Sequence, residues 1–414
     1  MQQRSVDVVV AGHICLDMIP ALHDRPTGMD SLFVPGKLVD VGPVVMSTGG
    51  AVSNTGIALH RLGAQVRLMG KVGRDPFGRN IVDIVQAAGA GLSEDMIVTD
   101  GEHSSYSIVI SPPGVDRVFL HHTGTNDTFV SDDVQEAAVR QARLFHFGYP
   151  PLMRSMYRSE GAELERLFRK VKRAGLTTSL DLAKPDPASD AGKADWLRIL
   201  SRTLPHVDLF LPSLEEILFM LDRAKFEQLE AAHGSSLLGA VDGDLLAWLA
   251  DRLLGFGTAV AAIKLGEYGL YMRTTADRAR LAAMGACAPR SPDWLNRECL
   301  TTCYRVDVAG TTGAGDCTIA GFLMGVIGGA APHEALRGAV AVGACNVEQA
   351  DATSGVPSWS DVERRLAGGW ERYPQALKLE GWTWDERQAI WRGPHDGFGA
   401  EHSEMKGGDS DETK

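Results

Sequence analysis

Short apolar runs alternate with amphipathic stretches through most of this chain. Residues 6–11 are mainly β-branched and apolar, as is typical of a strand buried on both faces. Comparable runs follow at residues 66–69, 144–147, 178–182, 207–211 and 258–265. Apolar residues recur at helical spacing between several of these runs, at residues 79–88, 163–174 and 242–254, with Asp242 as the N-cap of the last. Strands that alternate with helices predict an α/β fold with a parallel sheet covered on both faces.

Two segments break this rhythm and predict an accessory sheet. Residues 32–45 and 106–122 have the character of antiparallel β structure, and the second carries a turn signal at residues 112–114. An accessory sheet inserted into an α/β domain often covers a site. We therefore predict a small β lid built from approximately residues 14–46 and 103–123.

The character of the chain changes again near its C-terminal end. Residues 1–368 are predicted to form the main domain, and residues 369–414 a C-terminal extension. The extension holds several tryptophans and becomes polar and acidic after Gly397. Such a composition predicts that the last part of the extension is disordered.

Composition narrows the possible partners. The formal net charge of −12 disfavours a general nucleic-acid or anionic-membrane binder, because both need a cationic surface. No stretch approaches the ~20 apolar residues needed to span a bilayer, and the first residues lack the pattern of a secretory signal. Cys287, Cys299 and Cys303 make a weak partial metal site, because their spacing is wrong and histidines are missing. Six scattered cysteines fit reduced thiols, and we expect a cytoplasmic protein with a small-molecule partner.

The most informative segment is residues 310–316, Gly-Thr-Thr-Gly-Ala-Gly-Asp, which an apolar run follows. The small residues Gly313, Ala314 and Gly315 let backbone N–H groups converge, and the following helix adds its positive N-terminal dipole. Asp316 then lies at the edge of an anion site, where it could accept the proton of an attacking hydroxyl. The alternative is an ordinary tight turn whose helix begins with an aspartate.

A second segment, residues 49–54, reads Gly-Gly-Ala-Val-Ser-Asn. Gly49 and Gly50 permit a backbone bend or the close approach of a ligand. Asn54 offers two donors and an acceptor, which suits recognition of hydroxyl groups. The alternative is a helix N-terminus that Asn54 caps.

Together, in this order and separation, the two segments resemble the ribokinase-like or PfkB carbohydrate kinase family, over about residues 6 to 366. Three further segments fit the same resemblance, namely residues 70–78, 124–126 and 264–269. The resemblance implies a Rossmann-like three-layer α/β/α domain with a small β-sheet lid. It also implies ATP as phosphoryl donor and Mg2+ as its partner.

The resemblance also implies roles for individual residues. Asp316 corresponds to the catalytic base, and Gly313, Ala314 and Gly315 correspond to the anion hole. The implied substrate-binding residues are Asp17, Gly49, Gly50 and Asn54. The implied nucleotide-binding residues are Lys264, Gly266, Gly269 and Thr312. Glu216 matches the acidic residue that holds magnesium through water.

Two of these assignments have simpler alternatives. Asp17 could be a strand-end residue that faces solvent. Glu216, with Glu215, could be a solvated residue in the first turn of helix Leu214–Leu221, where the helix dipole favours it.

The chain departs from the family pattern at five positions. Ser213 replaces the usual asparagine near the metal, and Gly310 replaces an aspartate that helps to bind a monovalent cation, which puts potassium activation in doubt. Lys264 replaces a threonine, and it either pairs with a nucleotide phosphate or points outward at a strand end. Cys15 and Ala51 replace an asparagine and a lysine of ribokinases, which weighs against a ribokinase.

We therefore expect an ATP-dependent kinase that phosphorylates a hydroxymethyl group of a sugar. A nucleoside kinase of the same fold and a regulator that binds sugar without catalysis remain alternatives. Tyr149, in the turn at residues 148–151, is expected to border the pocket and stack on a sugar or base. Basic side chains that could line the lid are Arg25, Lys37, His121 and His122. A lid with exposed edges could pair two copies into a homodimer.

Overall fold

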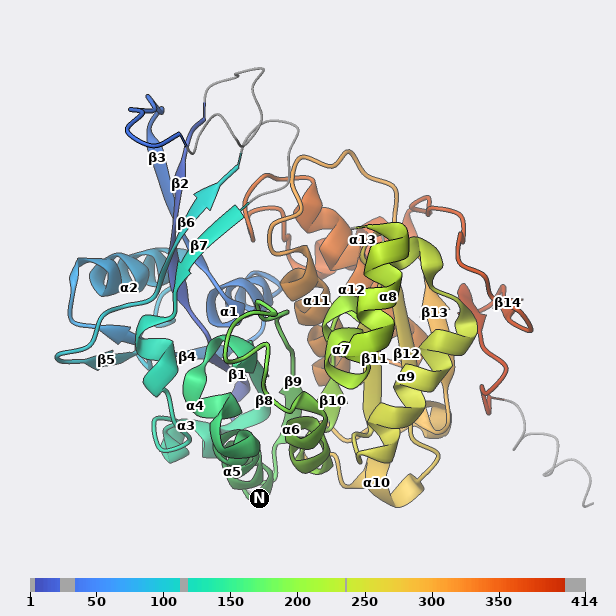
Figure 1. The fold of residues 1–414 in the computed structure, drawn as a ribbon. Helices are drawn as coiled ribbons and strands as arrows, with labels where there is room; N and C mark the ends of the chain where they lie inside the picture. Colours follow the sequence, from blue (N-terminus) through green and yellow to red (C-terminus); the bar gives the residue numbers. More distant parts are fainter. Residues whose placement is uncertain (1–3, 23–33, 112–117, 235–236, 399–414) are drawn as a thin grey trace, which may run out of the picture.

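The structure is a computed structural model that describes residues 4–22, 34–111, 118–234 and 237–398. Within these residues, eleven strands form the main sheet (Figure 1). In spatial order they are β14 (Thr383–Asp385), β15 (Ile390–Arg392), β13 (Glu298–Thr301), β12 (Leu270–Thr274), β11 (Val260–Lys264), β10 (Leu209–Phe210), β9 (Thr177–Leu180), β8 (Ala142–Gly148), β1 (Val6–Gly12), β4 (Val66–Gly73) and β5 (Ile97–Thr99). From β11 to β5 the neighbours are parallel, and the strands beyond β11 are antiparallel. All six predicted strands lie in the parallel part.

Alternate residues of the central strands point into two separate cores. Val8 and Val10 of β1 pack in one core, whereas Val9 and Ala11 pack in the other. The first core is covered by α1 (Ala51–Arg61), α2 (Pro76–Ala88), α10 (Arg278–Ala282), α11 (Ala314–Gly328), α12 (Pro332–Val347) and α13 (Trp359–Ala367). The second is covered by α3 (Glu136–Gln141), α4 (Arg154–Tyr157), α5 (Ala162–Arg173), α6 (Trp196–Thr203), α7 (Leu214–Leu221), α8 (Arg223–His233) and α9 (Gly243–Gly255). The predicted three-layer α/β/α architecture is confirmed.

Side-chain caps fix where the predicted helices begin. The Asp242 carboxylate accepts the Leu245 N–H at 2.9 Å, which confirms it as the N-cap of α9. Helix α2 begins three residues before the predicted residue 79, because Asp75 accepts the Gly78 N–H at 2.7 Å and Pro76 occupies the first helical position. None of the helices in the described ranges is both long and apolar enough to cross a membrane.

The lid is a separate four-stranded sheet, and Figure 1 shows it standing beyond one end of the main sheet. Its order is β3 (Val44–Gly49), β2 (Cys15–Pro20), β6 (Tyr106–Ile110) and β7 (Val118–His122). β2 and β6 are parallel, and the other two pairs are antiparallel. The predicted turn at residues 112–114 and Arg25 lie outside the described residues.

The first predicted lid segment, residues 32–45, was placed too early in the chain. Residues 34–43 form turns and irregular structure, and the strand runs from Val44 to Gly49. Pro35 with Gly36 favours a turn, and Pro43 has no N–H to donate to a strand ladder, so the pairing with β2 begins directly after it.

The C-terminal extension adds β14 and β15 to the main sheet and covers a buried ion pair. The Arg297 Nε lies 2.6 Å from the Asp396 Oδ1, and the two side chains are 0% and 2% exposed. Asp396 also accepts the backbone N–H of Glu298 at 3.1 Å. A charge removed from water this completely depends on its partner, so this pair joins the extension to the core.

Replacing Asp396 with alanine should therefore destabilise the whole fold, because the Arg297 guanidinium would stay buried without its counter-charge. We expect a loss of about 3–5 kcal/mol in the free energy of unfolding, measured by urea denaturation. The control is Glu371→Ala, which breaks the exposed Arg305–Glu371 pair and should cost less than about 1 kcal/mol. Equal losses in the two variants would contradict this role of Asp396.

Candidate active site

The residues singled out from the sequence gather where the lid meets the carboxyl ends of the central strands. Strand β1 ends at Gly12 and β8 at Gly148, and the two strands are neighbours in register there. The chain leaves β1 directly for β2 of the lid, and β3 of the lid leads directly into α1. In an open parallel sheet, ligands bind outside the carboxyl ends of the strands.

The carboxylate of Asp316 lies buried in the first turn of α11, surrounded by donors. Its Oδ2 accepts the Asn54 amide at 2.9 Å, and its Oδ1 accepts the Thr55 hydroxyl at 3.3 Å. The Tyr149 hydroxyl lies 3.0 and 2.9 Å from the two oxygens. Burial raises the pKa of Asp316, although the donors from Asn54 and Tyr149 and the charge of Lys264 oppose this. The result is a positioned carboxylate of increased basicity.

Tyr149 makes a contact that was not predicted. Its hydroxyl is bound to Asp316. Its backbone has φ 65°, the left-handed conformation that non-glycine residues seldom adopt. Such a conformation persists only where its surroundings enforce it, which fits a side chain turned inward from the end of β8.

The loop before Asp316 has the predicted glycine geometry. Gly313 has φ 72°, and a Cβ there would lie 2.4 Å from the Ala352 carbonyl oxygen, so only glycine fits. The Ala314 N–H donates to the Thr311 carbonyl at 3.3 Å. The 15-residue helix α11 begins at this point and directs its positive dipole toward the loop.

Gly49 and Gly50 make room for two polar side chains of the β1–β2 region. A Cβ on Gly49 would lie 2.3 Å from the Asp17 Oδ2, and a Cβ on Gly50 would lie 2.5 Å from the His13 Nδ1. Asp17 accepts the thiol of Cys15 at 3.3 Å and is half-buried. Asn54 lies within α1, whose N-cap is Gly50, so the alternative that Asn54 caps this helix is wrong.

Lys264 does not point outward at its strand end, but forms a buried ion pair at the edge of the charged cluster. Its Nζ lies 2.6 Å from the Asp181 Oδ1, with side-chain exposures of 12% and 1%. Burial disfavours the ammonium ion, but the carboxylates of Asp181 and Glu216 outweigh it and raise the pKa of Lys264. Burial raises the pKa of Asp181 as well, and the nearby Glu216 and Asp316 carboxylates add to this. Lys264 thus balances a cluster of acidic groups.

Glu216 and Ser213 form a capping box at the start of α7. The Glu216 carboxylate accepts the Ser213 N–H at 2.7 Å, and the Ser213 hydroxyl accepts the Glu216 N–H at 3.4 Å. Burial raises the pKa of Glu216. Glu216 thus lies in the first turn of α7, as the simpler alternative has it, but it is half-buried and bonded to the backbone.

A cavity of about 770 Å³ adjoins the charged cluster and the start of α11. Three of the four predicted nucleotide-binding residues, Lys264, Gly266 and Gly269, line it together with Ala314 and Gly315. Among the described lining residues, Thr311 appears where Thr312 was predicted. The Thr312 carbonyl instead accepts the Asn346 amide at 2.8 Å. The wall opposite comes from α12 and from residues 373–377 of the extension.

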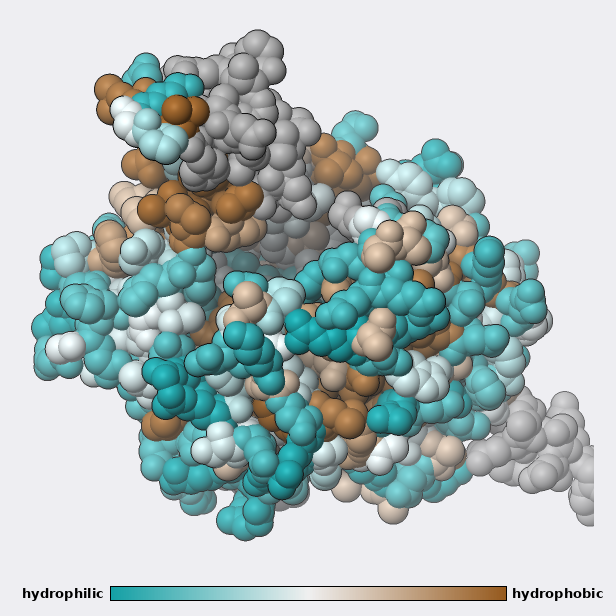
Figure 2. Space-filling view, viewed as in Figure 1, coloured by the Kyte–Doolittle hydropathy of each residue, from teal (hydrophilic) through white to brown (hydrophobic). Residues whose placement is uncertain are grey.

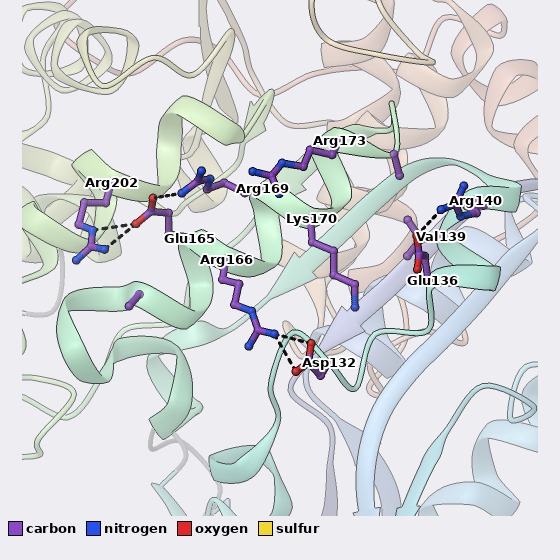
Figure 3. Close-up of a pocket in the computed structure, with 12 residues that line it drawn as sticks. Asp132, Glu136, Val139, Arg140, Glu165, Arg166, Arg169, Lys170, Arg173 and Arg202 are labelled. Carbon is purple, nitrogen blue, oxygen red and sulfur yellow. Dashed lines mark hydrogen bonds and ion pairs between the residues drawn. The ribbon is translucent and has the colours of Figure 1, made fainter.

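A second cavity, of about 790 Å³, lies between α3 and α5 and contains none of the predicted residues. Figure 3 shows several of its basic side chains paired with acidic neighbours, as Arg166 is with Asp132 and Arg202 with Glu165, whereas Lys170 and Arg173 have no acidic partner among the residues drawn. These pairs compensate much of its charge at the surface. The cavity beside Asp316 is therefore the candidate active site.

The sequence reasoning missed Asp181, Thr55 and His13. Asp181 directly follows β9, so the rule that polar residues at strand carboxyl ends converge could have found it. His13 likewise follows β1. Thr55 gives no such signal, because a threonine within a helix is common.

Known proteins resemble this chain over most of its length. The model of the pfkB family carbohydrate kinases matches residues 6–359. A probable fructokinase-4 of Arabidopsis thaliana is 24% identical over 370 residues, which are 87% of this chain and 97% of that protein. The structure of a Xylella fastidiosa fructokinase with bound ATP has a TM-score of 0.64 and 18% identity, over 87% of this chain and 98% of that one. A candidate ribokinase II of E. coli with ATP and Mg2+ has a TM-score of 0.62 and 19% identity, over 88% and 99% of the two chains. With its three-layer fold, its β lid and this match, the chain belongs to the pfkB family of carbohydrate kinases.

Proposed function

We propose that this carbohydrate kinase transfers the γ-phosphoryl group of ATP to a hydroxymethyl group of a sugar, with Asp316 as the base. The observation that carries the proposal is the buried Asp316 carboxylate, which three donors hold between the lid segment and the 770 Å³ cavity. A sugar hydroxyl that replaces the Tyr149 hydroxyl on one carboxylate oxygen would be deprotonated as it attacks phosphorus. The N–H groups of Gly313 and Gly315, that of Ala314 once it leaves the Thr311 carbonyl, and the α11 dipole would hold the transferring phosphoryl.

Substrate and nucleotide would occupy opposite sides of Asp316. Asp17, Gly49, Gly50 and Asn54 belong to the lid and to α1, and we assign the sugar to them. Lys264, Gly266, Gly269 and the loop at Thr312 lie on the cavity side, and we assign ATP to them. The ATP-bound fructokinase of the same fold supports ATP as the nucleotide.

Mg2+ fits the acidic cluster of the same site. The carboxylates of Asp181 and Glu216 are oxygen donors of the kind that Mg2+ prefers, and their mutual repulsion contributes to the raised pKa of Asp181. Glu216 would hold the ion through water, beside Lys264. The ion would supply positive charge that neutralises the phosphates.

The exposed surface of the lid also supports pairing of two copies of the chain. Figure 2 shows apolar surface gathered over the lid. On its edge strands β3 and β7 the apolar side chains are between 38% and 60% exposed, namely Val44, Val45, Met46, Val118, Phe119 and Leu120. We propose a homodimer formed through this lid surface, which would remove the exposed patch from water.

The cysteines support a cytoplasmic location, because all six are free, as expected in a reducing compartment.

Asp316→Asn should lower kcat by roughly 10²–10⁴ while sugar and ATP still bind, because the change keeps the shape and removes the proton acceptor. The measurement is steady-state ADP release over a panel of sugars and nucleosides, with calorimetry for binding. Asp307→Asn, at an exposed position in the preceding loop, is the control. Turnover of Asp316→Asn within a few-fold of the parent would show that the base lies elsewhere.

Asp17→Ala should raise the KM for the sugar by roughly 5- to 150-fold, which corresponds to about 1–3 kcal/mol for one lost hydroxyl partner. The KM for ATP should change little. Asn54→Ala should additionally lower kcat, because the Asn54 amide also holds Asp316. Asp40→Ala, in the exposed loop that precedes β3, is the control. An effect of Asp17→Ala confined to ATP would reverse the assignment of the two sides.

Sedimentation velocity tests the lid dimer. The parent chain should sediment as a dimer, and Val45→Lys should shift it toward monomer, because a charge in an apolar interface must be desolvated. Val98→Lys, at a 44% exposed position on the edge strand β5 of the main sheet, should leave the dimer intact. A monomeric parent chain, or a dimer that survives Val45→Lys, would exclude pairing through this surface.

A further inference from the structure

A cluster of nitrogen and sulfur donors lies at the junction of the core and the lid, beside the residues assigned to the sugar. It consists of His13 after β1, Cys15 at the start of β2 and His121 on β7. The donor atoms of the three side chains all lie within 4.8 Å of one another. Two segments far apart in the chain, residues 13–15 and strand β7, therefore converge on one small volume.

The separation of the two imidazoles matches a metal-binding pair. The Nε2 atoms of His13 and His121 lie 3.3 Å apart. Two nitrogen ligands of a tetrahedral zinc ion at about 2.0–2.1 Å lie about 3.3 Å from each other. The same distance also permits a hydrogen bond between the rings when one of them donates. The same placement of the two rings would therefore fit either a bound metal ion or a proton shared between the two Nε2 atoms.

Neighbouring groups hold the donors in place. The Ser107 hydroxyl lies 3.0 Å from the His121 Nδ1 and 3.7 Å from the Cys15 sulfur, and Ser107 is paired with His121 in the β6–β7 register. This contact directs the His121 Nε2 toward His13. The backbone of His13 is fixed on both sides, because its N–H donates to Gly148 and its carbonyl accepts the Val52 N–H, each at 3.2 Å. Such outer contacts are the usual support of metal ligands.

The chemistry of the donor set selects the kind of ion. Imidazole nitrogen and cysteine sulfur suit Zn2+ and disfavour Mg2+, which takes oxygen ligands. His13 and Cys15 are buried, whereas His121 is exposed and opens the cluster to solvent. Burial lowers the pKa of both histidines, which favours the neutral rings that bind metal, and it raises the pKa of the Cys15 thiol, whose proton the ion must therefore displace. On binding, a sulfur–metal bond would replace the Cys15 S–H bond, and the proton would leave through Asp17, whose Oδ1 lies 3.3 Å from the sulfur.

We propose that His13, Cys15 and His121 bind one Zn2+ ion, and that the bound ion blocks the sugar side of the active site. The first half rests on the cluster alone, and the second rests on the proposed function. The bound ion would block the sugar side because of where the three ligands lie. Cys15 is hydrogen-bonded to Asp17, which we assign to the sugar, and the His13 ring centre lies 6.0 Å from that of Tyr149, which contacts the base.

Metal binding is tested without turnover. The full chain, freed of metal with a chelator, is titrated with Zn2+ in competition with a chromophoric chelator, and with Co2+ in an absorbance titration. We expect one equivalent to bind, with a thiolate-to-cobalt charge-transfer band. His121→Ala should weaken binding at least tenfold, and Cys15→Ser should abolish the band.

Matched controls separate the cluster from general metal affinity. His122→Ala changes the next residue of β7, which points to the other face and packs on Tyr106, and Cys303→Ser changes a thiol outside the cluster. Both controls should bind Zn2+ like the parent. No stoichiometric binding by the parent, or equal binding by His121→Ala and His122→Ala, would overturn the site.

Inhibition of the kinase reaction by Zn2+ tests whether the bound ion blocks the sugar side. Zn2+ should raise the KM for the sugar without raising that for ATP, and His121→Ala should require at least tenfold more Zn2+ for the same effect. Stoichiometric binding with an unchanged KM for the sugar would overturn the block but leave the site. Zn2+ binding by a chain that phosphorylates none of the sugars would count against the proposed function, not against the site.

Discussion

Burying the carboxylate of Asp316 costs free energy that the surrounding fold must offset with hydrogen-bond donors. The donors come from two other parts of the chain, Asn54 and Thr55 of α1 and Tyr149 after β8. Helix α1 follows directly from β3 of the lid. The same contacts that stabilise the carboxylate therefore connect the lid to the core, and any movement of α1 would change the basicity of the group that we propose as the base.

The second constraint is charge balance on the nucleotide side. Lys264 is the cation in contact with Asp181, and Glu216 is close enough to contribute to its raised pKa. A buried lysine among carboxylates is stable only while they remain near it. This explains how a lysine fits where the family pattern has a threonine: its ammonium group serves the acidic cluster and lies beside Gly315, at the edge of the cavity. The phosphates of ATP and the Mg2+ ion would therefore enter a cavity beside which charged side chains already lie in place.

The elements that depend on local pattern were predictable, and the contacts between distant residues were not. The six buried strands were recognisable because they are short apolar runs, and Asp242 was recognisable because a cap acts on its own helix. The Lys264–Asp181 pair joins residues 83 positions apart, and no local sequence pattern predicts such a contact. The segment that we propose as catalytic could be recognised because its glycines serve the local backbone geometry, as Gly313 shows. The contact of Tyr149 with Asp316 depends on the left-handed backbone conformation of Tyr149 after β8, which the sequence around Tyr149 does not predict.

The departures from the family pattern surround the residues that we propose for phosphoryl transfer and leave those residues unchanged. At the start of α11, Gly313, Ala314, Gly315 and Asp316 keep the pattern. On the lid side, Cys15 and Ala51 replace residues of the ribokinase pattern, and the Cys15 sulfur lies in one cluster with two histidines. An asparagine can donate to and accept from sugar hydroxyls, whereas a buried thiol bonded to Asp17 is a weak donor whose contact is already made. The residues that we propose as base and anion hole therefore keep the pattern. The departures lie on both sides of them, at Cys15 and Ala51 toward the lid and at Ser213, Gly310 and Lys264 toward the nucleotide.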